Sequence, residues 1–297
     1  MKQRFLKISA LLATLMTLLV LTGCTTKSKA EPAKPASHLS TVATTTMYSK
    51  KLGLDWNYDV YLPEGYNPKS NKTYPVLYMM HGLYGNHRNL LERFNSQQIL
   101  DGIIHRSKNQ AIVVFVDGFN SFYIDAKDGQ KMESAIMKDL VPTIEKNYKV
   151  SKDPAKHAIG GISMGGYGAA RLALKYPDQF SKAVLISPSV WQKLPAESPF
   201  RQLHAFTDGK KPWSDKVYDQ LFPTNYLNSD SKSVKFFVES TSSDTTVPIK
   251  DVDKFVADLK DKGVDVKFVK DSGDNHNWTY WAKAAPNAYS WALKEMN

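Results

Sequence analysis

The chain has 297 residues, a single cysteine and a formal net charge of +10 at pH 7, from 39 Lys and Arg against 29 Asp and Glu. One cysteine excludes an intramolecular disulfide, so the fold has to rest on a buried apolar core, which a chain of this length can supply. The positive charge is not gathered in a basic helix or an arginine-rich stripe. We therefore expect no nucleic-acid partner; attraction to anionic cell-wall polymers or lipid headgroups fits the charge better.

The first residues have the features of an export signal. Lys2, Arg4 and Lys7 precede an apolar stretch over residues 8–21, which is shorter than the roughly 20 residues of a membrane-spanning helix. The stretch ends in the sequence LTGC, which resembles the lipobox of bacterial lipoproteins and places Cys24 at the lipidated position. We predict a lipoprotein signal peptide over residues 1–23 and an exported protein anchored to the outer face of the bacterial cell membrane. The alternative is an ordinary signal peptide with a chance cysteine.

Residues 24–46 are rich in Lys, Thr, Ser, Ala and Pro, and we predict a flexible tether there, followed by one folded domain over residues 47–297. Within that domain, short continuous apolar runs alternate with segments of helical periodicity. This pattern predicts an α/β fold with a mostly parallel central sheet and helices on both faces. The predicted strands are 75–80, 111–116, 156–162, 183–187, 234–239 and 264–269, with helices around 136–144 and 252–259. An antiparallel hairpin over residues 47–62 is expected to open the sheet.

Residues 191–225 form the least regular part of the domain, with four prolines and several aromatic residues. Long irregular inserts are often functional. Two interpretations stay open for this one: a cap over the active site, or aromatic packing at the surface.

The sequence Gly161-Ile162-Ser163-Met164-Gly165 matches the Gly-x-Ser-x-Gly nucleophile elbow. In this motif a serine occupies a strained turn between a strand and a helix, and the flanking glycines leave room for the turn. An apolar strand pattern precedes Ser163 and an alanine-rich helical pattern follows it, which is the context that the motif requires. We predict that Ser163 is a nucleophile.

A serine hydroxyl needs a base to remove its proton, and in this fold the acid and then the histidine follow the serine along the chain. Only His204 and His276 lie beyond Ser163; His204 is in the irregular insert, whereas His276 is in a polar loop after the last predicted strand. We predict His276 as the base. Asp244, in the loop after the strand 234–239, is the predicted acid, with Asp251 as the reserve candidate.

An oxyanion hole needs two backbone N–H donors. We expect one from Met164, next to the nucleophile, and one from Leu83, in the His-Gly turn after the strand 75–80. His81 and His87 of this region could suggest a metal pair, but no further ligand cluster joins them, so a structural turn is favoured. No metal or organic cofactor is expected.

Together these residues resemble the esterase D family of α/β-hydrolases, which includes tributyrin, feruloyl and enterochelin esterases, S-formylglutathione hydrolases and mycolyltransferases. The resemblance rests on the Ser-Met-Gly-Gly core at 163–166, the Ser-Pro-Ser-Val-Trp run at 187–191 and the His-Asn-Trp ending at 276–278. It implies an α/β-hydrolase fold and a triad of Ser163, Asp244 and His276. The acid loop departs from the family's Gly-x-x-Asp pattern because it reads Ser-Thr-Ser-Ser-Asp.

These features predict a serine carboxylic-ester hydrolase that acts on small acyl, sugar or hydroxycinnamoyl esters of cell-wall or plant origin. Trp191 and Trp278 are candidate contacts for an aromatic acyl group, although aromatic side chains also simply pack. Acyl transfer to a cell-wall or lipid alcohol is one rival, and a non-catalytic surface binding protein is another. An S-formylglutathione hydrolase is disfavoured because its thioester substrate is cytosolic.

Overall fold

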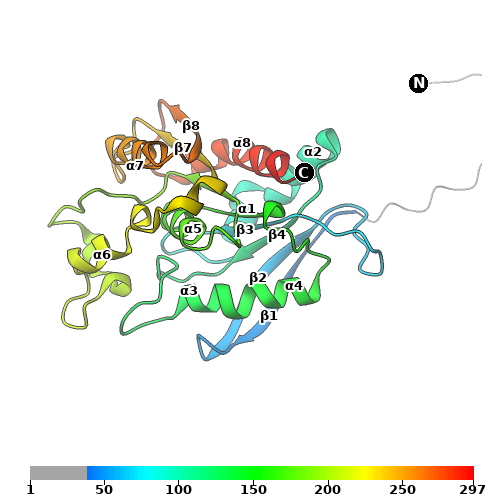
Figure 1. The fold of residues 1–297 in the computed structure, drawn as a ribbon, viewed down its shortest axis with the longest axis horizontal. Coiled ribbons are helices and arrows are strands. Elements are labelled where there is room, and N and C mark those ends of the chain that lie inside the picture. Colours follow the sequence, from blue (N-terminus) through cyan, green and yellow to red (C-terminus); the bar gives the residue numbers. More distant parts are fainter. Residues whose placement is uncertain (1–38) are drawn as a thin grey trace, which may run out of the picture. The chain divides into compact units, whose positions relative to one another are not determined.

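The computed structural model describes residues 39–297, so the predicted signal peptide, Cys24 and most of the predicted tether lie outside the described residues. One eight-stranded sheet has the order β1-β2-β4-β3-β5-β6-β7-β8 (Figure 1). The strands are β1 Thr41–Ser49, β2 Leu54–Leu62, β3 Val76–Met80, β4 Ile112–Val116, β5 His157–Ile162, β6 Lys182–Ile186, β7 Lys235–Thr241 and β8 Asp265–Asp271. Strand β2 runs opposite to the other strands, so its pairings with β1 and β4 are antiparallel and the remaining pairings are parallel. The predicted α/β-hydrolase fold with a mostly parallel sheet is confirmed.

The hairpin at the start of the sheet begins earlier than predicted. Strand β1 starts at Thr41, where it pairs with Leu62 of β2, so residues 41–46 belong to the sheet and not to a flexible tether. The threonine-rich sequence has no apolar alternation, but β1 is an edge strand whose side chains are mostly exposed. Its pairing with β2 therefore needs little apolar surface.

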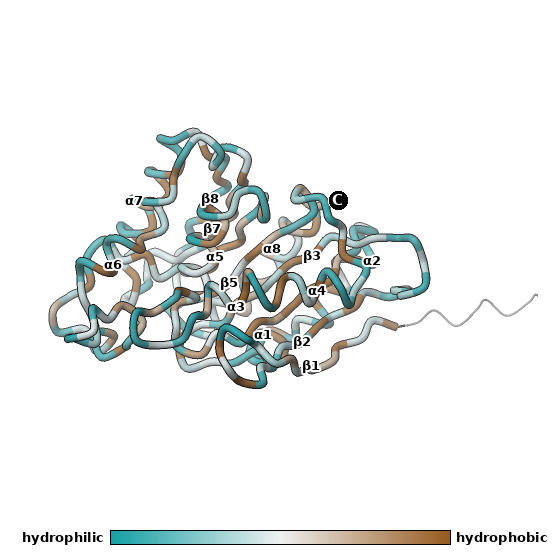
Figure 2. The backbone as a smooth tube through the Cα atoms, turned by 60° about the horizontal axis from the view of Figure 1, so that its bottom comes forward, coloured by the Kyte–Doolittle hydropathy of each residue, from teal (hydrophilic) through white to brown (hydrophobic). Residues whose placement is uncertain are grey.

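Helices cover both faces of the sheet and separate two apolar cores. Alternate residues of β3 point to opposite sides: Tyr78 packs in one core and Leu77 in the other. Helices α3 Met132–Ala135, α4 Val141–Asn147, α5 Met164–Lys175 and α7 Ile249–Asp261 cover the first core, and α1 Asn89–Phe94, α2 Ser96–Ser107 and α8 Trp278–Met296 cover the second. Figure 2 shows hydrophobic residues along β3 in the middle of the sheet and hydrophilic residues on the peripheral loops. In the described part of the chain, no helix combines the length and the apolar character needed to cross a membrane.

The insert over residues 191–225 contains α6 Asp215–Leu221 and short 3-10 turns. Its aromatic residues Phe206, Trp213 and Tyr218 are buried, and Phe206 packs against Phe122 and Tyr167. These three side chains therefore pack inside the domain, in the core on the α5 side of the sheet.

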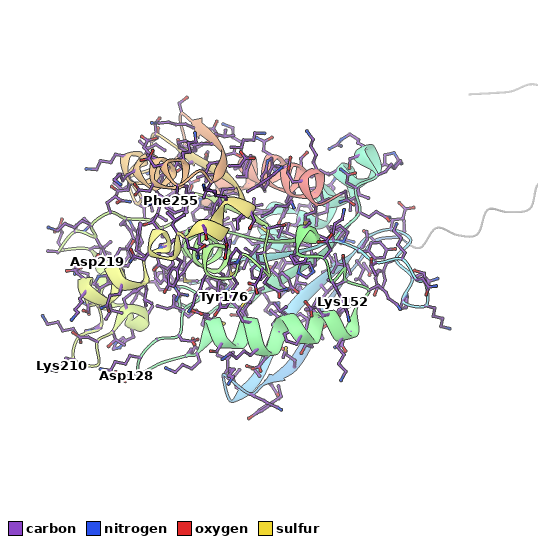
Figure 3. All side chains as sticks on the ribbon, viewed as in Figure 1. Asp128, Lys152, Tyr176, Lys210, Asp219 and Phe255 are labelled. Atoms are coloured by element: carbon purple, nitrogen blue, oxygen red, sulfur yellow. The ribbon has the colours of Figure 1, made fainter. Side chains whose placement is uncertain are left out.

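The same insert also contacts the loop between β4 and α3. Lys127 donates a hydrogen bond from its ammonium group to the carbonyl of Asp208 at 2.8 Å. Asp128 of that loop lies against Gly209 of the insert, where an added Cβ would be 2.8 Å from Oδ2 of Asp128; Figure 3 labels Asp128 and the neighbouring Lys210. The insert is thus attached to the rest of the domain at its polar tip as well as through its aromatic core.

A buried ion pair joins α3 to α5, the helix that follows the nucleophile elbow. The guanidinium of Arg171 donates to the carboxylate of Glu133 and, at 2.8 Å, to the hydroxyl of Tyr226 after the insert. Burial alone would raise the pKa of Glu133, but the charge of Arg171 and the other hydrogen-bond donors outweigh it and lower that pKa. The pair therefore exists as ions inside the fold.

Candidate active site

Ser163 stands in the sharp turn between β5 and α5. Its φ of 53° and ψ of −116° are strained for a residue with a side chain. A Cβ on Gly165 would lie 2.2 Å from the carbonyl oxygen of Met80, and one on Gly161 would lie 2.6 Å from the same atom. The two motif glycines are therefore required because the turn packs directly against the end of β3.

A continuous chain of hydrogen bonds links the three side chains predicted as the triad. The hydroxyl oxygen of Ser163 lies 2.7 Å from Nε2 of His276, and Nδ1 of His276 lies 2.7 Å from Oδ2 of Asp244. Asp244 lies in the loop between β7 and α7, and His276 in the loop between β8 and α8. The alternatives are placed elsewhere: Asp251 is in the first turn of α7, and His204 is in a 3-10 turn of the insert.

Hydrogen-bond partners fix the direction of each bond in this chain. Oδ1 of Asp244 accepts from the N–H groups of Thr246 at 2.9 Å and Val247 at 2.8 Å. The other oxygen of the carboxylate, Oδ2, is therefore the acceptor for His276. Nδ1 of His276 must carry a proton in order to donate this hydrogen bond. Nε2 is then unprotonated and accepts the proton of the Ser163 hydroxyl. This is the protonation state in which an imidazole can act as a base.

Two further residues position His276, and their roles were not predicted from the sequence. Oδ1 of Asn275 accepts from the backbone N–H of His276 at 2.7 Å and from the backbone N–H of Thr245 at 2.9 Å, which ties the base loop to the acid loop. The ring of Trp281 meets the imidazole edge to face, with 4.9 Å between ring centroids. The sequence did carry a signal for the position of Trp281. An asparagine such as Asn277 often caps a helix, and the residue four positions later then lies one turn into that helix, close to the loop that holds His276.

The two predicted oxyanion donors lie at the ends of adjacent strands. Met164 is the first residue of α5, whose first N–H groups have no partner within the helix. The carbonyl of Gly82 accepts from Nδ1 of His81 at 2.6 Å, and Nε2 of His81 accepts from the N–H of Gly118 at 2.9 Å. Because C=O and N–H of a trans peptide point in opposite directions, the N–H of Leu83 points away from His81.

His87 does not pair with His81. Its Nδ1 lies 2.7 Å from the carboxylate of Asp59, a fully buried residue of β2. Burial alone would raise the pKa of Asp59, but hydrogen bonds from His87 and Thr44 outweigh it and lower that pKa. Within residues 39–297 no three His, Cys, Asp or Glu side chains are grouped so as to hold a metal ion.

The family model described as "Putative esterase" matches residues 49–291 of the chain. The chain belongs to this esterase family. The prediction of a carboxylic-ester hydrolase is therefore confirmed.

Known relatives and a solved structure agree with this assignment. The chain is 28% identical over 232 residues to an acetyl esterase of Caldicellulosiruptor saccharolyticus, covering 74% of this chain and 83% of that protein. It is 26% identical over 166 residues to an endo-1,4-beta-xylanase/feruloyl esterase of Xylanibacter ruminicola, covering 53% of this chain and 23% of the relative. The solved structure of a ferulic acid esterase matches with a TM-score of 0.74 and 26% identity, covering 88% of this chain and 100% of that one.

The two tryptophans proposed as substrate contacts in this esterase differ in their surroundings. Trp191 is only 2% exposed, and its indole N–H donates to the carbonyl of Thr246 at 2.7 Å. It is therefore placed to support the acid loop and offers no open face to a substrate. Trp278 is partly exposed and packs against Phe94, with the guanidinium of Arg93 4.6 Å from its ring centre.

Proposed function

We propose that this esterase hydrolyses small carboxylic esters through an acyl-enzyme on Ser163. The observation that carries the proposal is the hydrogen-bonded chain from Asp244 through His276 to Ser163, with 2.7 Å at each link. It supplies a nucleophile, a base in the right tautomer and an acid that holds the base.

In the acylation step, Nε2 of His276 takes the proton of Ser163 as the serine oxygen bonds to the ester carbonyl carbon. The N–H groups of Leu83 and Met164 donate hydrogen bonds that stabilise the negative charge developing on the carbonyl oxygen. Asp244 stabilises the imidazolium that forms for the lifetime of the tetrahedral intermediate. When this intermediate collapses, His276 gives its proton to the departing alcohol.

In the deacylation step, water takes the place of the alcohol. His276 removes one proton from the water, the resulting hydroxide adds to the acyl carbon, and the second tetrahedral intermediate uses the same two N–H donors. Its collapse releases the carboxylic acid and returns the proton from His276 to the oxygen of Ser163. No redox step or external cofactor enters this sequence.

The substrates that we propose are short acyl esters, acetylated sugars and hydroxycinnamoyl esters. The names of the relatives support this range, since they are an acetyl esterase and a bifunctional xylanase/feruloyl esterase. Nitrophenyl esters of graded chain length, assayed beside methyl ferulate and acetylated sugars, would define the preferred acyl group. Adding glycerol or sugars as acceptors would measure how far an alcohol replaces water.

We also propose that the enzyme works outside the cytoplasm on a lipid anchor. The basis is the sequence pattern of residues 1–24, with Cys24 at the lipobox position. In a bacterial host, the full chain should partition with membranes and incorporate labelled palmitate, and Cys24→Ala should abolish the labelling. Equal labelling of Cys24→Ala would refute the anchor.

The direct test of the proposed chemistry is Ser163→Ala. The substitution removes one hydroxyl from a position that is 5% exposed, so the fold should be retained. Turnover of nitrophenyl acetate should fall by about 10⁴-fold or more, because no acyl-enzyme can form without the hydroxyl of Ser163. An undiminished rate of ester cleavage by the folded variant would reject the proposal.

A further inference from the structure

The turn that follows β6 brings a second serine against the nucleophile. The hydroxyl oxygen of Ser189 lies 3.1 Å from that of Ser163, and the N–H of Ser189 donates to the carbonyl of Ser163 at 3.0 Å. Ser189 is fully buried. Within the part of the chain that the structure describes, its hydroxyl has no hydrogen-bond partner other than Ser163.

Several contacts fix this turn. Ser187 has a φ of 45°, a left-handed conformation that is costly for a residue other than glycine. Its N–H donates to the carbonyl of Glu239 in β7 at 2.8 Å. On the other side, Pro188 packs on the first turn of α5 so closely that a Cβ on Gly166 would lie 2.9 Å from the Cα of Pro188. A strained turn held from two sides thus sets the position of Ser189.

The direction of the contact between the two serines follows from counting protons. Ser163 has one hydroxyl proton, and Nε2 of His276 accepts it at 2.7 Å because Nδ1 already donates to Asp244. In the contact at 3.1 Å, Ser163 is therefore the acceptor and Ser189 the donor. We infer that Ser189 is a fourth catalytic side chain, which donates a hydrogen bond to the attacking oxygen of Ser163.

This bond has two effects on the reaction, and both follow from the lone pairs of the serine oxygen. The oxygen of Ser163 has two lone pairs; one accepts from Ser189, so the other is directed toward the substrate carbon and the side chain is fixed in one rotamer. As His276 takes the proton, the oxygen gains negative charge, and the hydrogen bond from Ser189 strengthens. An interaction that is stronger in the transition state than before it lowers the barrier. Ser189 keeps its own proton throughout.

The inference rests on the proposed nucleophile, and Ser189→Ala tests it against a matched control. Ser240 on β7 is also a fully buried serine, and its hydroxyl has no partner among the described residues, so Ser240→Ala makes the same chemical change away from Ser163. For each variant, kcat and KM for nitrophenyl acetate, the second-order rate of labelling by a fluorophosphonate, and Tm would be measured. Labelling reports the attack by Ser163 alone.

Ser189→Ala should lower kcat and the labelling rate together by about 10- to 100-fold, the range for a hydrogen bond to a group that gains charge. KM and Tm should stay near the wild-type values, and Ser240→Ala should label at the wild-type rate. Ser189→Thr, which keeps the hydroxyl, should label faster than Ser189→Ala.

Labelling of folded Ser189→Ala within about twofold of wild type would overturn the inference. So would equal labelling rates for folded Ser189→Thr and Ser189→Ala. These outcomes leave the proposed function standing, provided that the wild-type enzyme is labelled and hydrolyses the ester. A wild-type enzyme that does neither would overturn the proposed function together with this inference.

Discussion

Replacing Asp244 by asparagine should damage catalysis through the tautomer of His276. Oδ1 of Asp244 accepts two backbone N–H groups, from Thr246 and Val247, so an amide NH₂ at this position would face two donors. The asparagine oxygen will therefore occupy the Oδ1 site and its NH₂ group will face Nδ1 of His276. That donor favours an imidazole with its proton on Nε2, which has no lone pair for the proton of Ser163.

The size of the effect can be worked out from the bonds lost. The contact of 2.7 Å between Nδ1 and Oδ2 is a hydrogen bond to a charged group, which contributes about 1.5–3 kcal/mol. Returning the imidazole to the reactive tautomer against an opposing NH₂ adds roughly 1–3 kcal/mol, the cost of an unsatisfied buried donor. Together these costs amount to about 2.5–6 kcal/mol, or a loss of about 10²- to 10⁴-fold in kcat.

The assay is nitrophenyl acetate hydrolysis by the wild type, Asp244→Asn and Asp251→Asn, with thermal unfolding of each. Asp251 is the matched control because it is also an aspartate in the segment after β7, and it is 8% exposed. Asp251→Asn should retain nearly full activity. The reasoning would be refuted by folded Asp244→Asn with kcat within about tenfold of wild type, or by a larger loss in Asp251→Asn.

Three further predictions concern the surroundings of the site. Burial raises the pKa of Glu239 from 4.5 to about 7, so ionising this carboxyl group costs more in the folded than in the unfolded protein. The free energy of unfolding of the wild type should therefore fall as the pH rises from about 4.5 to about 7. Glu239→Gln should remove roughly 3 kcal/mol of this pH dependence in urea denaturation, and an unchanged pH profile would contradict it. Trp191→Phe removes the donor to Thr246 and should lower kcat severalfold at similar KM; a change in KM alone would instead indicate substrate contact. Glu133→Gln leaves the buried charge of Arg171 unpaired and should cost about 3–5 kcal/mol in urea denaturation, whereas a loss below about 1 kcal/mol would show that the pair is unimportant.

The sequence was sufficient for the central strands and for choosing three side chains that the fold brings together, Ser163, Asp244 and His276, because both depend on local patterns in a known chain order. Buried parallel strands are continuous apolar runs, and β3, β4 and β5 follow the predicted ranges within a residue. The position of Asp244 was predicted despite its atypical loop, since the acid has to follow β7. What fixes its carboxylate is the pair of N–H donors two and three residues later.

Other features depend on contacts between distant segments, which a single sequence does not reveal. Strand β1 forms because it pairs along its whole length with β2, although four of its nine residues are threonine and most of its side chains are exposed. Ser189 contacts Ser163 although 26 residues separate them along the chain. The contact depends on a positive φ at Ser187, and the sequence does not reveal that conformation because the residue is not a glycine. For Trp191 the sequence left substrate contact and packing open, because the burial of its ring depends on distant segments and is not visible in its sequence neighbourhood.

The most direct test of the central claim is to identify the residue that becomes covalently modified. The full-length enzyme would be treated with a fluorophosphonate, digested and mapped by mass spectrometry, beside Ser163→Ala and His276→Ala. We expect a single adduct on the peptide that contains Ser163, no adduct in Ser163→Ala, and very slow labelling in His276→Ala. An adduct on any other residue of the wild type, or undiminished labelling of Ser163→Ala, would contradict the account.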